Sequence, residues 1–485
     1  MKSKNLHLTL SLLASALIGT ATFQACKDDK DDNNSPVSVK LEDHSKTPAL
    51  LKKLPGFESL ELYSLFSSED EFPESPGYRF GGSADGAGLI KDPNGSGFVM
   101  LVNNEDNYSL SKISFDATFK PVKGEYVLNS DAGQWRLCSG TMVTPAEHGF
   151  GPTYLCVGES DVEAQTHKIN PLTSGIQSNS TAGGLGHWSG ENAVPLPKDA
   201  YPGKTVLVLG EDADDASGGQ VVLYISNTVG DLENGTQYML KRKDGNQKEM
   251  DMQAGSSYDV EFVKIENHKT LTGAQVQAMV DPLQAIKFGR VEDIDYRKGS
   301  AAAGREIYFN VTGQDYAKTN LDRSRTKMGR TYRLMLDQND PTKGKLECIL
   351  DGDDDNGIAK DFQNPDNICV TRNYVYIQED SNTYGSETHD GYIYQYNIAT
   401  KELKKVLELD HRRDDPKFKA TAARGNWEYG ALIDISDVIG VPDTFTLCVQ
   451  PHTWKEEAFK APDKGSKRTD EMQGSQVVLI KGLPR

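Results

Sequence analysis

The sequence predicts an all-β protein, a β-propeller that we expect to have six blades and short helical insertions. Apolar residues mostly recur with a period of two in short runs, and turns rich in Gly, Asp, Asn and Pro separate these runs. Strands that follow one another without intervening helices argue against a parallel α/β sheet and favour a sandwich, a barrel or a propeller. A body of this length fits a single large propeller best.

The predicted strands are short, and no clean repeat marks the blade boundaries. Two segments are predicted as short helices, 271–285 and 47–54. The clearest strand predictions are 97–102, 205–209, 220–225, 306–311, 368–370, 374–377, 391–396, 444–449 and 476–480.

The N-terminus indicates export. Two lysines precede an apolar run, 8–23, that is too short to span a bilayer comfortably, and this is typical of a signal peptide. The following Phe23-Gln24-Ala25-Cys26 resembles a lipobox, so we expect a signal peptide over 1–25 and a lipid on Cys26. The alternative is an ordinary secretory signal with an incidental cysteine.

The segment after Cys26 is expected to be an acidic tether over 26–45, followed by a single propeller domain over 46–485. The tether resembles the export tag of Bacteroidota lipoproteins, which would place the domain on the outer face of the outer membrane. A plain linker is the alternative. The protein would then contact the membrane only through its lipid, and we expect a monomer.

The charge balance restricts the possible partners. The chain has 71 acidic and 53 basic residues, a formal net charge of -18, which argues against a nucleic-acid or anionic-membrane surface and is compatible with cation binding. Five cysteines follow Cys26, and none forms a CxxC pair. Because five is an odd number, at least one of them is unpaired.

Acidic residues recur just after strands, beside Gly, Asn or Pro. In a propeller, the equivalent loops of successive blades point at one central funnel, so carboxylates far apart in sequence meet there. Several oxygen ligands suit Ca²⁺. The segments are Asn103 to Asp106, Thr144 to Glu147, Gly190 to Asn192, Gly210 to Asp212, Arg290 to Asp293, Asn364 to Asn367, Gln378 to Asp380 and Trp427 to Tyr429.

These segments carry a resemblance to a known family. Their order and their neighbours, including Leu137 to Glu147, Gly186 to Glu191, Phe288 to Asp293, Phe362 to Asn367 and Val449 to His452, resemble the PhoX-type alkaline phosphatases. That family consists of calcium- and iron-dependent propellers, and the similarity covers most of 77–482. This sequence departs from the family at Asn104 and Gly190, where histidine is usual, and in a shortened segment after Cys138.

The resemblance implies a mixed metal centre. It makes Cys138 a ligand of Fe³⁺, for which a soft thiolate is a suitable donor, and it makes Glu147, Glu191 and Glu292 metal ligands. Arg290 matches a phosphate-contacting arginine.

The residues alone leave other interpretations open. Cys138 could form a disulfide with Cys156 or simply be buried. Arg290 could form an ion pair with Glu292 or Asp293. Four further ligands are assigned by context: Glu105, Glu211, Glu379 and Glu428.

The predicted function is metal-dependent hydrolysis of a small phosphomonoester. The sequence contains no serine nucleophile elbow, HExxH pair, Walker loop or intact EF-hand, which favours metal chemistry over covalent catalysis. One alternative is a non-enzymatic calcium-binding surface propeller that binds a glycan, a protein or a nutrient. Another is a phosphodiesterase, phytase-like or lactonase-type hydrolase that uses calcium alone.

Overall fold

A computed structural model describes residues 38–485. Cys26, the predicted signal peptide and most of the predicted tether lie outside the described residues. Six strands form a ring in which each contacts the next and the last contacts the first. The strands of this inner ring are β3 (Ala84–Lys91), β7 (Arg136–Val143), β10 (Gly190–Pro195), β15 (Val291–Tyr296), β19 (Pro365–Val370) and β23 (Glu428–Asp434).

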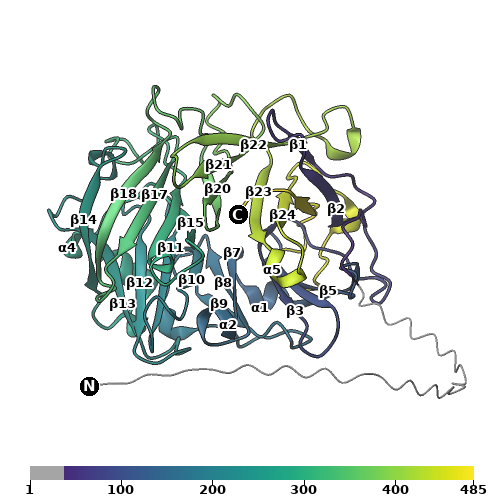
Figure 1. Cartoon of the computed structure of the whole chain (residues 1–485), viewed down its shortest axis with the longest axis horizontal. Coiled ribbons are helices and arrows are strands. Elements are labelled where there is room, and N and C mark those ends of the chain that lie inside the picture. The colour runs from purple at the N-terminus through teal and green to yellow at the C-terminus, as the bar shows by residue number, and fades with distance from the viewer. Residues whose placement is uncertain (1–37) are drawn as a thin grey trace, which may run out of the picture. The chain divides into compact units, whose positions relative to one another are not determined.

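Each inner strand begins an antiparallel sheet, or blade, that extends outward from the ring (Figure 1). The second strands are β4 (Phe98–Asn104), β8 (Thr153–Glu159), β11 (Thr205–Glu211), β16 (Glu306–Val311), β20 (Tyr374–Glu379) and β24 (Thr444–Gln450). The outer strands are β5 (Ser109–Phe115), β6 (Pro121–Leu128), β9 (Thr166–Ile169), β12 (Val221–Ser226), β13 (Thr236–Arg242), β17 (Arg330–Leu336), β18 (Lys343–Asp351), β21 (Tyr392–Asn397), β22 (Leu403–Leu409) and β25 (Gln476–Lys481).

Strands from the N-terminal part of the domain complete the last two blades. Strand β2 (Glu61–Ser67) pairs with β25, so the sixth blade combines one early strand with three from the end of the chain. Strand β1 (Leu51–Lys53) adds a fifth strand to the fifth blade by pairing with β22. Closure between the two ends of the chain removes the open gap in the ring that would otherwise separate the last blade from the first.

The third and fourth blades are also joined at their outer edges. Strand β14 (Ser257–Lys264) pairs with β13 on one side and β18 on the other, which produces one nine-stranded sheet. In Figure 1 this joined edge lies at the left of the view. The join covers two edges that would otherwise expose unpaired backbone groups.

The hydrophobic core is divided among the six interfaces between neighbouring blades. Each interface contains one cluster of buried apolar residues. The cluster between the sixth and first blades includes Phe66, Phe80 and Phe115 and also contacts the partly buried Val39 and Leu41, which precede the first strand. Because each interface buries its own core, the sheets are held face to face around the axis.

The prediction of an all-β propeller with short helices is confirmed. The α-helices of the described chain have four or five residues, and segment 271–285 contains two of them. Segment 47–54 was wrongly predicted as helical and contains strand β1. Among the described residues, no helix is long and apolar enough to cross a membrane. The helices are α1 (Ser130–Gly133), α2 (Pro145–His148), α3 (Gly273–Gln277), α4 (Val280–Leu283) and α5 (Ser436–Ile439).

Strand β2, which closes the ring, should contribute strongly to stability. Phe66 of β2 is fully buried and contacts Phe80 edge-on at 4.9 Å between ring centroids. We expect Phe66→Ala to lower the free energy of unfolding by about 3–5 kcal/mol, because it leaves a cavity between the sixth and first blades. Chemical denaturation measures this loss. Leu321→Ala, at a side chain that is 73% exposed, is the control, and an equal effect of both changes would contradict the role of the closing strand.

Candidate metal centre

A β-bulge lies near the start of every inner strand. In five of the six blades the irregularity leaves two residues of the inner strand unpaired, and the first of these is Asp85, Cys138, Glu191, Glu292 or Asp366. In the sixth blade, Glu428 is the first residue of the strand, just before its bulge. A bulge redirects a side chain out of the regular alternation. All six side chains line one cavity.

The second unpaired residues of these bulges connect blades that face each other across the ring as well as blades that are neighbours. The amide of Asn367 donates to the hydroxyl of Ser139 at 2.9 Å, and the amide of Asn192 donates to the carboxylate of Asp293. The carboxylate of Asp293 also accepts the backbone N–H of Ile368 at 3.1 Å. These hydrogen bonds fix the bulges relative to one another. The first unpaired residue of each bulge, whose side chain lines the cavity, is therefore held in place.

The ends of the second strands supply further polar groups to the same cavity. Its volume is about 310 Å³, and ten carboxylates but only two guanidinium groups line it. An assembly of like charges in one cavity is unfavourable unless cations or protons neutralise it. The charged lining residues are Asp85, Glu105, Asp106, Glu159, Glu191, Asp212, Glu292, Asp366, Asp380 and Glu428, with Arg136 and Arg290.

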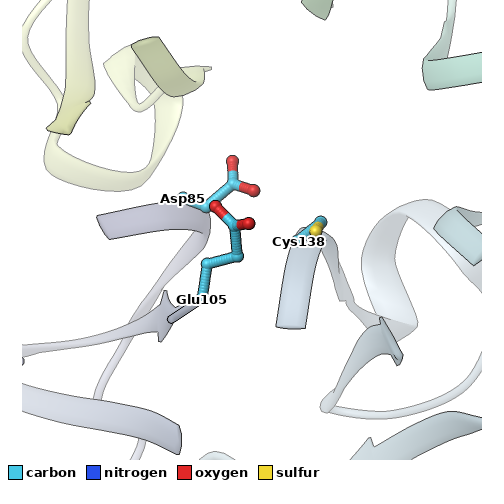
Figure 2. A group of neighbouring side chains, drawn as sticks. All are labelled: Asp85, Glu105 and Cys138. Atoms are coloured by element: carbon cyan, nitrogen blue, oxygen red, sulfur yellow. The ribbon is translucent and has the colours of Figure 1, made fainter. Parts of the chain in front are cut away.

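Two groups of three side chains are close enough to share a cation. Ligand atoms of Asp85, Glu105 and Cys138 lie within 4.8 Å of one another, and the same holds for Glu191, Glu292 and Asp366. Figure 2 shows the carboxylates of Asp85 and Glu105 near the Cys138 thiol on the neighbouring blade. The first group combines a soft sulfur donor with hard oxygens, whereas the second offers oxygens alone.

The carboxylates strongly disfavour one another's charged forms. Burial raises the pKa of Glu292 well above its ordinary value, and the neighbouring Asp212 and Asp366 raise it further. Burial and Asp366 raise the pKa of Glu191 in the same way. Burial, with the charge of Glu159, also raises the pKa of the Cys138 thiol. A bound cation reverses these shifts because it stabilises the deprotonated ligands.

Three buried oxygen atoms of the lining accept no hydrogen bond within the described chain: Oδ1 of Asp106, Oε1 of Glu292 and Oε1 of Gln450. The Asp106 oxygen is in an ion pair with Arg136 at 3.0 Å, whereas Glu292 and Gln450 are each 1% exposed. Arg290 is the cation near Glu292, at 3.5 Å, beyond an ordinary charged hydrogen bond. A buried acceptor without a donor is costly, and a cation would satisfy it. The donor set therefore fits metal ions.

Arg290 is held rigidly at the wall of this cavity. Its Nε and Nη2 donate to the two oxygens of Asp212 at 2.7 and 2.8 Å, and its Nη1 donates to Asn382 at 2.8 Å. Its backbone φ of 71° lies in the left-handed region, which costs about 1–2 kcal/mol for a residue with a Cβ. Strain of this kind concentrates at functional sites, where surrounding contacts maintain it.

Glu147, which the sequence analysis assigned as a metal ligand, does not reach the cavity. The cavity lies at the start of β7, where Cys138 is, whereas Glu147 follows the end of that strand in α2. Val143 follows Cys138 by five positions of extended strand, a length of roughly 16 Å. Glu147 is an exposed residue that accepts a hydrogen bond from the hydroxyl of Tyr296. Glu159, at the end of β8, supplies the carboxylate beside Cys138 instead, at 3.0 Å.

Glu211 and Glu379 are buried next to the cavity but do not line it. In both places the following residue, Asp212 or Asp380, lines it instead. Successive side chains of a strand point to opposite sides. The glutamate that precedes each of these aspartates therefore points away from the cavity. Glu379 accepts hydrogen bonds from the backbone of Gln363 at 2.6 Å and contacts His389 at 2.7 Å.

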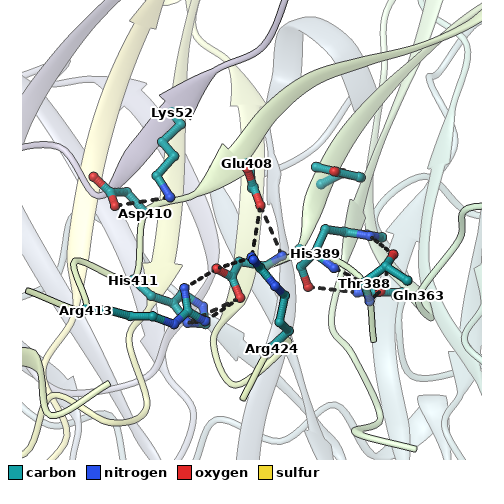
Figure 3. A network of polar contacts seen from close by, with 12 residues as sticks. Lys52, Gln363, Thr388, His389, Glu408, Asp410, His411, Arg413 and Arg424 are labelled. Atoms are coloured by element: carbon teal, nitrogen blue, oxygen red, sulfur yellow. Dashed lines mark hydrogen bonds and ion pairs between the residues drawn. The ribbon is translucent and has the colours of Figure 1, made fainter. Parts of the chain in front are cut away.

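The surroundings of Glu379 are structural. His389 belongs to a polar network with Gln363 and Thr388, and the same network continues to His411, Arg413 and Arg424 (Figure 3). Arg413 makes two contacts with the fully buried carboxylate of Asp390. This network ties the segment after β22 to the loop after β20, and none of its residues lines the cavity.

Five residues that line the cavity were not among the ligands predicted from the sequence: Asp85, Glu159, Asp212, Asp366 and Asp380. Once the six inner strands are aligned on their bulges, Asp85 and Asp366 occupy the same position as Glu191 and Glu292. An alignment of the six inner strands on this position could have identified Asp85 and Asp366 from the sequence. The expected alternative of a disulfide at Cys138 does not occur, since all five cysteines of the described chain are unpaired and buried.

Comparison with known proteins gives one family match. A model of the family described as alkaline phosphatase PhoX matches residues 168–428. This range starts in the second blade and ends at the first residue of the sixth, and it includes Glu191, Arg290, Glu292 and Asp366. No curated protein matches the sequence.

Solved structures resemble the chain only weakly. An aldose sugar dehydrogenase from Streptomyces coelicolor, bound to PQQ, is 9% identical with a TM-score of 0.33, and the match covers 87% of this chain and 99% of that one. The α-L-arabinofuranosidase Arb93A from Fusarium graminearum is 12% identical with a TM-score of 0.38, over 84% and 96% of the two chains. Matches at these scores carry no information about the activity of this chain.

The crowded carboxylates predict a pH dependence that metal ions should suppress. Burial and the neighbouring Asp212 raise the pKa of Glu159 from 4.5 to about 8. Between these values Glu159 binds more protons in the folded chain than in the unfolded chain, so its contribution to stability is fully present below pH 4.5 and is lost as the pH rises through about 8. We expect the melting temperature in a chelator to fall over this range and saturating Ca²⁺ to restore it. A melting temperature unaffected by pH and chelator would contradict this.

Proposed function

Because the chain belongs to the PhoX family of alkaline phosphatases, we propose that it hydrolyses small phosphomonoesters with the help of metal ions held in its central cavity. The observation that supports this most is the convergence of carboxylates from all six blades around one rigid arginine. Cations and an arginine together neutralise a phosphoryl group from several sides.

The donor sets suggest different ions for the two groups of ligands. Glu191, Glu292 and Asp366 offer only oxygens and would hold Ca²⁺. Cys138, with Asp85 and Glu105, would hold Fe³⁺ through its thiolate. When bound, such ions polarise phosphoryl oxygens and provide an activated oxygen nucleophile at neutral pH.

The residues of the chain contribute positioning and charge. Asp212 and Asn382 fix the Arg290 guanidinium, and its remaining N–H groups would donate to the phosphoryl oxygens as negative charge develops on them. Because these partners hold the side chain before a substrate arrives, little reorganisation accompanies the reaction. The narrow polar cavity would admit the phosphoryl group and leave the rest of the ester near the rim.

A hydrolase that uses calcium alone is the second candidate. It is favoured by the contact between Cys138 and Glu159, because a thiol that donates to a carboxylate at 3.0 Å keeps its proton. A protonated thiol is a poor ligand for iron. Metal content separates the two candidates: iron together with calcium supports the first, and calcium alone supports the second.

We also propose that the propeller is anchored to the outer membrane through a lipid on Cys26. The support is the signal-like N-terminal sequence and its lipobox resemblance. In the sequence, residues 27–37 lie between Cys26 and the described part of the chain. Mass spectrometry of the purified N-terminal peptide tests the modification.

Two glutamates provide a matched test of the proposed activity. Glu292→Gln removes a charged ligand from the cavity, and we expect hydrolysis of 4-nitrophenyl phosphate to fall at least about 100-fold in kcat/KM. Glu147→Gln, at the other end of an inner strand, should stay within about threefold of the unchanged protein because Glu147 is not in the cavity. Chelation should abolish the activity, and Ca²⁺ should restore it. Equal rates for both variants, or full activity in chelator, would refute the proposal.

A further inference from the structure

Two arginines meet at Asp106, a residue of the cavity lining: Arg136, which also lines the cavity, and Arg468. Arg136 is at the start of β7, and Arg468 is in the long loop between β24 and β25, 451–475. Their Nη2 atoms lie 3.0 and 3.8 Å from the same oxygen, Oδ1 of Asp106. Two guanidinium groups that converge on one anionic oxygen resemble the way proteins bind phosphate.

The loop that carries Arg468 is fixed across the neighbouring blades. The backbone and hydroxyl of Ser466 donate to the carboxylate of Asp131 in α1 at 3.0 and 2.6 Å. The carboxylate of Asp463 accepts the backbone N–H of Ser130 in the same helix. Arg468 itself donates to the backbone oxygen of Asp106 at 2.6 Å. The position of its guanidinium is therefore set by the fold.

Both arginines keep unused donors and face solvent. The side chains of Arg136 and Arg468 are 39% and 33% exposed, although each makes ion pairs. Arg136 contacts Glu105 at 2.6 Å, and Arg468 contacts Glu471 at 3.3 Å. Each guanidinium has five N–H groups, more than these contacts use.

Metal binding would strengthen the positive potential at these two arginines. Glu105 belongs to one of the two candidate ligand groups, so a cation would compete with Arg136 for its charge. The Arg136 guanidinium would then be left with Asp106 as its remaining anionic partner. A phosphate beside the two arginines would gain a charge-assisted contact from each.

We propose that Arg136 and Arg468 form a second anion subsite, which binds a second phosphate group of a bisphosphorylated small molecule while the first phosphate lies in the cavity. The inference rests on the proposed phosphatase function and specifies its substrate class. A phosphomonoester with one phosphate would use the cavity alone. A bisphosphate would use both positions and bind more tightly.

Calorimetry on the calcium-loaded protein tests the subsite without relying on catalysis. The probes are propane-1,3-bisphosphonate and propylphosphonate, whose C–P bonds resist hydrolysis. We expect the bisphosphonate to bind about tenfold more tightly, and Arg468→Gln to reduce this preference to about twofold or less. Arg136→Gln should act similarly. Arg372→Gln, an exposed arginine after the far end of β19, is the control and should leave the preference intact.

Hydrolysis of fructose 1,6-bisphosphate and fructose 6-phosphate gives an independent comparison through the ratio of their kcat/KM values. A high ratio in the unchanged protein that falls in Arg468→Gln supports the subsite. Equal affinities for the two phosphonates, or a preference that survives both arginine substitutions, would overturn it. If the protein hydrolyses neither sugar phosphate but still prefers the bisphosphonate, the proposed function fails and the subsite stands.

Discussion

Electrostatic repulsion among buried carboxylates is the main physical condition that the central cavity has to satisfy. Side chains such as Asp85, Glu191, Glu292 and Asp366 are brought together from different blades, and burial and their mutual charges raise their pKa values. Folding alone gains nothing from this arrangement, since the same positions filled with apolar residues would pack without that cost. A protein that maintains such a cluster does so for ligands of opposite charge, and metal ions match the oxygen and sulfur donors that are present.

The fold supports this cluster through two features of its sheets. Bulges at the starts of the inner strands direct one side chain each into the cavity. Hydrogen bonds between adjacent bulges, such as that from the backbone of Ile368 to Asp293, and across the ring, from Asn367 to Ser139, link the blades there. Closure by β2 and the six interblade cores keep the inner ring intact. The geometry of the site is therefore a property of the whole ring, because no blade supplies more than a fraction of the ligands.

The sequence alone predicted the strands, the propeller and the gathering of acidic segments at one mouth. It placed Cys138, Glu191, Glu292 and Arg290 where the structure has them, lining the cavity. It failed where the outcome depended on strand direction or on one residue of register. Glu147 lies past the wrong end of β7, and Glu211 and Glu379 each precede the aspartate that lines the cavity. Bulges and strand ends have no reliable signal in a single sequence, since tertiary pairing decides them.

Anomalous diffraction from crystals grown with Ca²⁺ and Fe³⁺ would show whether the cavity binds both metals. Data collected on both sides of the iron absorption edge would separate the two elements. We expect an iron peak beside the Cys138 sulfur and calcium density among Glu191, Glu292 and Asp366. A cavity without any anomalous peak, in crystals soaked with both ions, would contradict it.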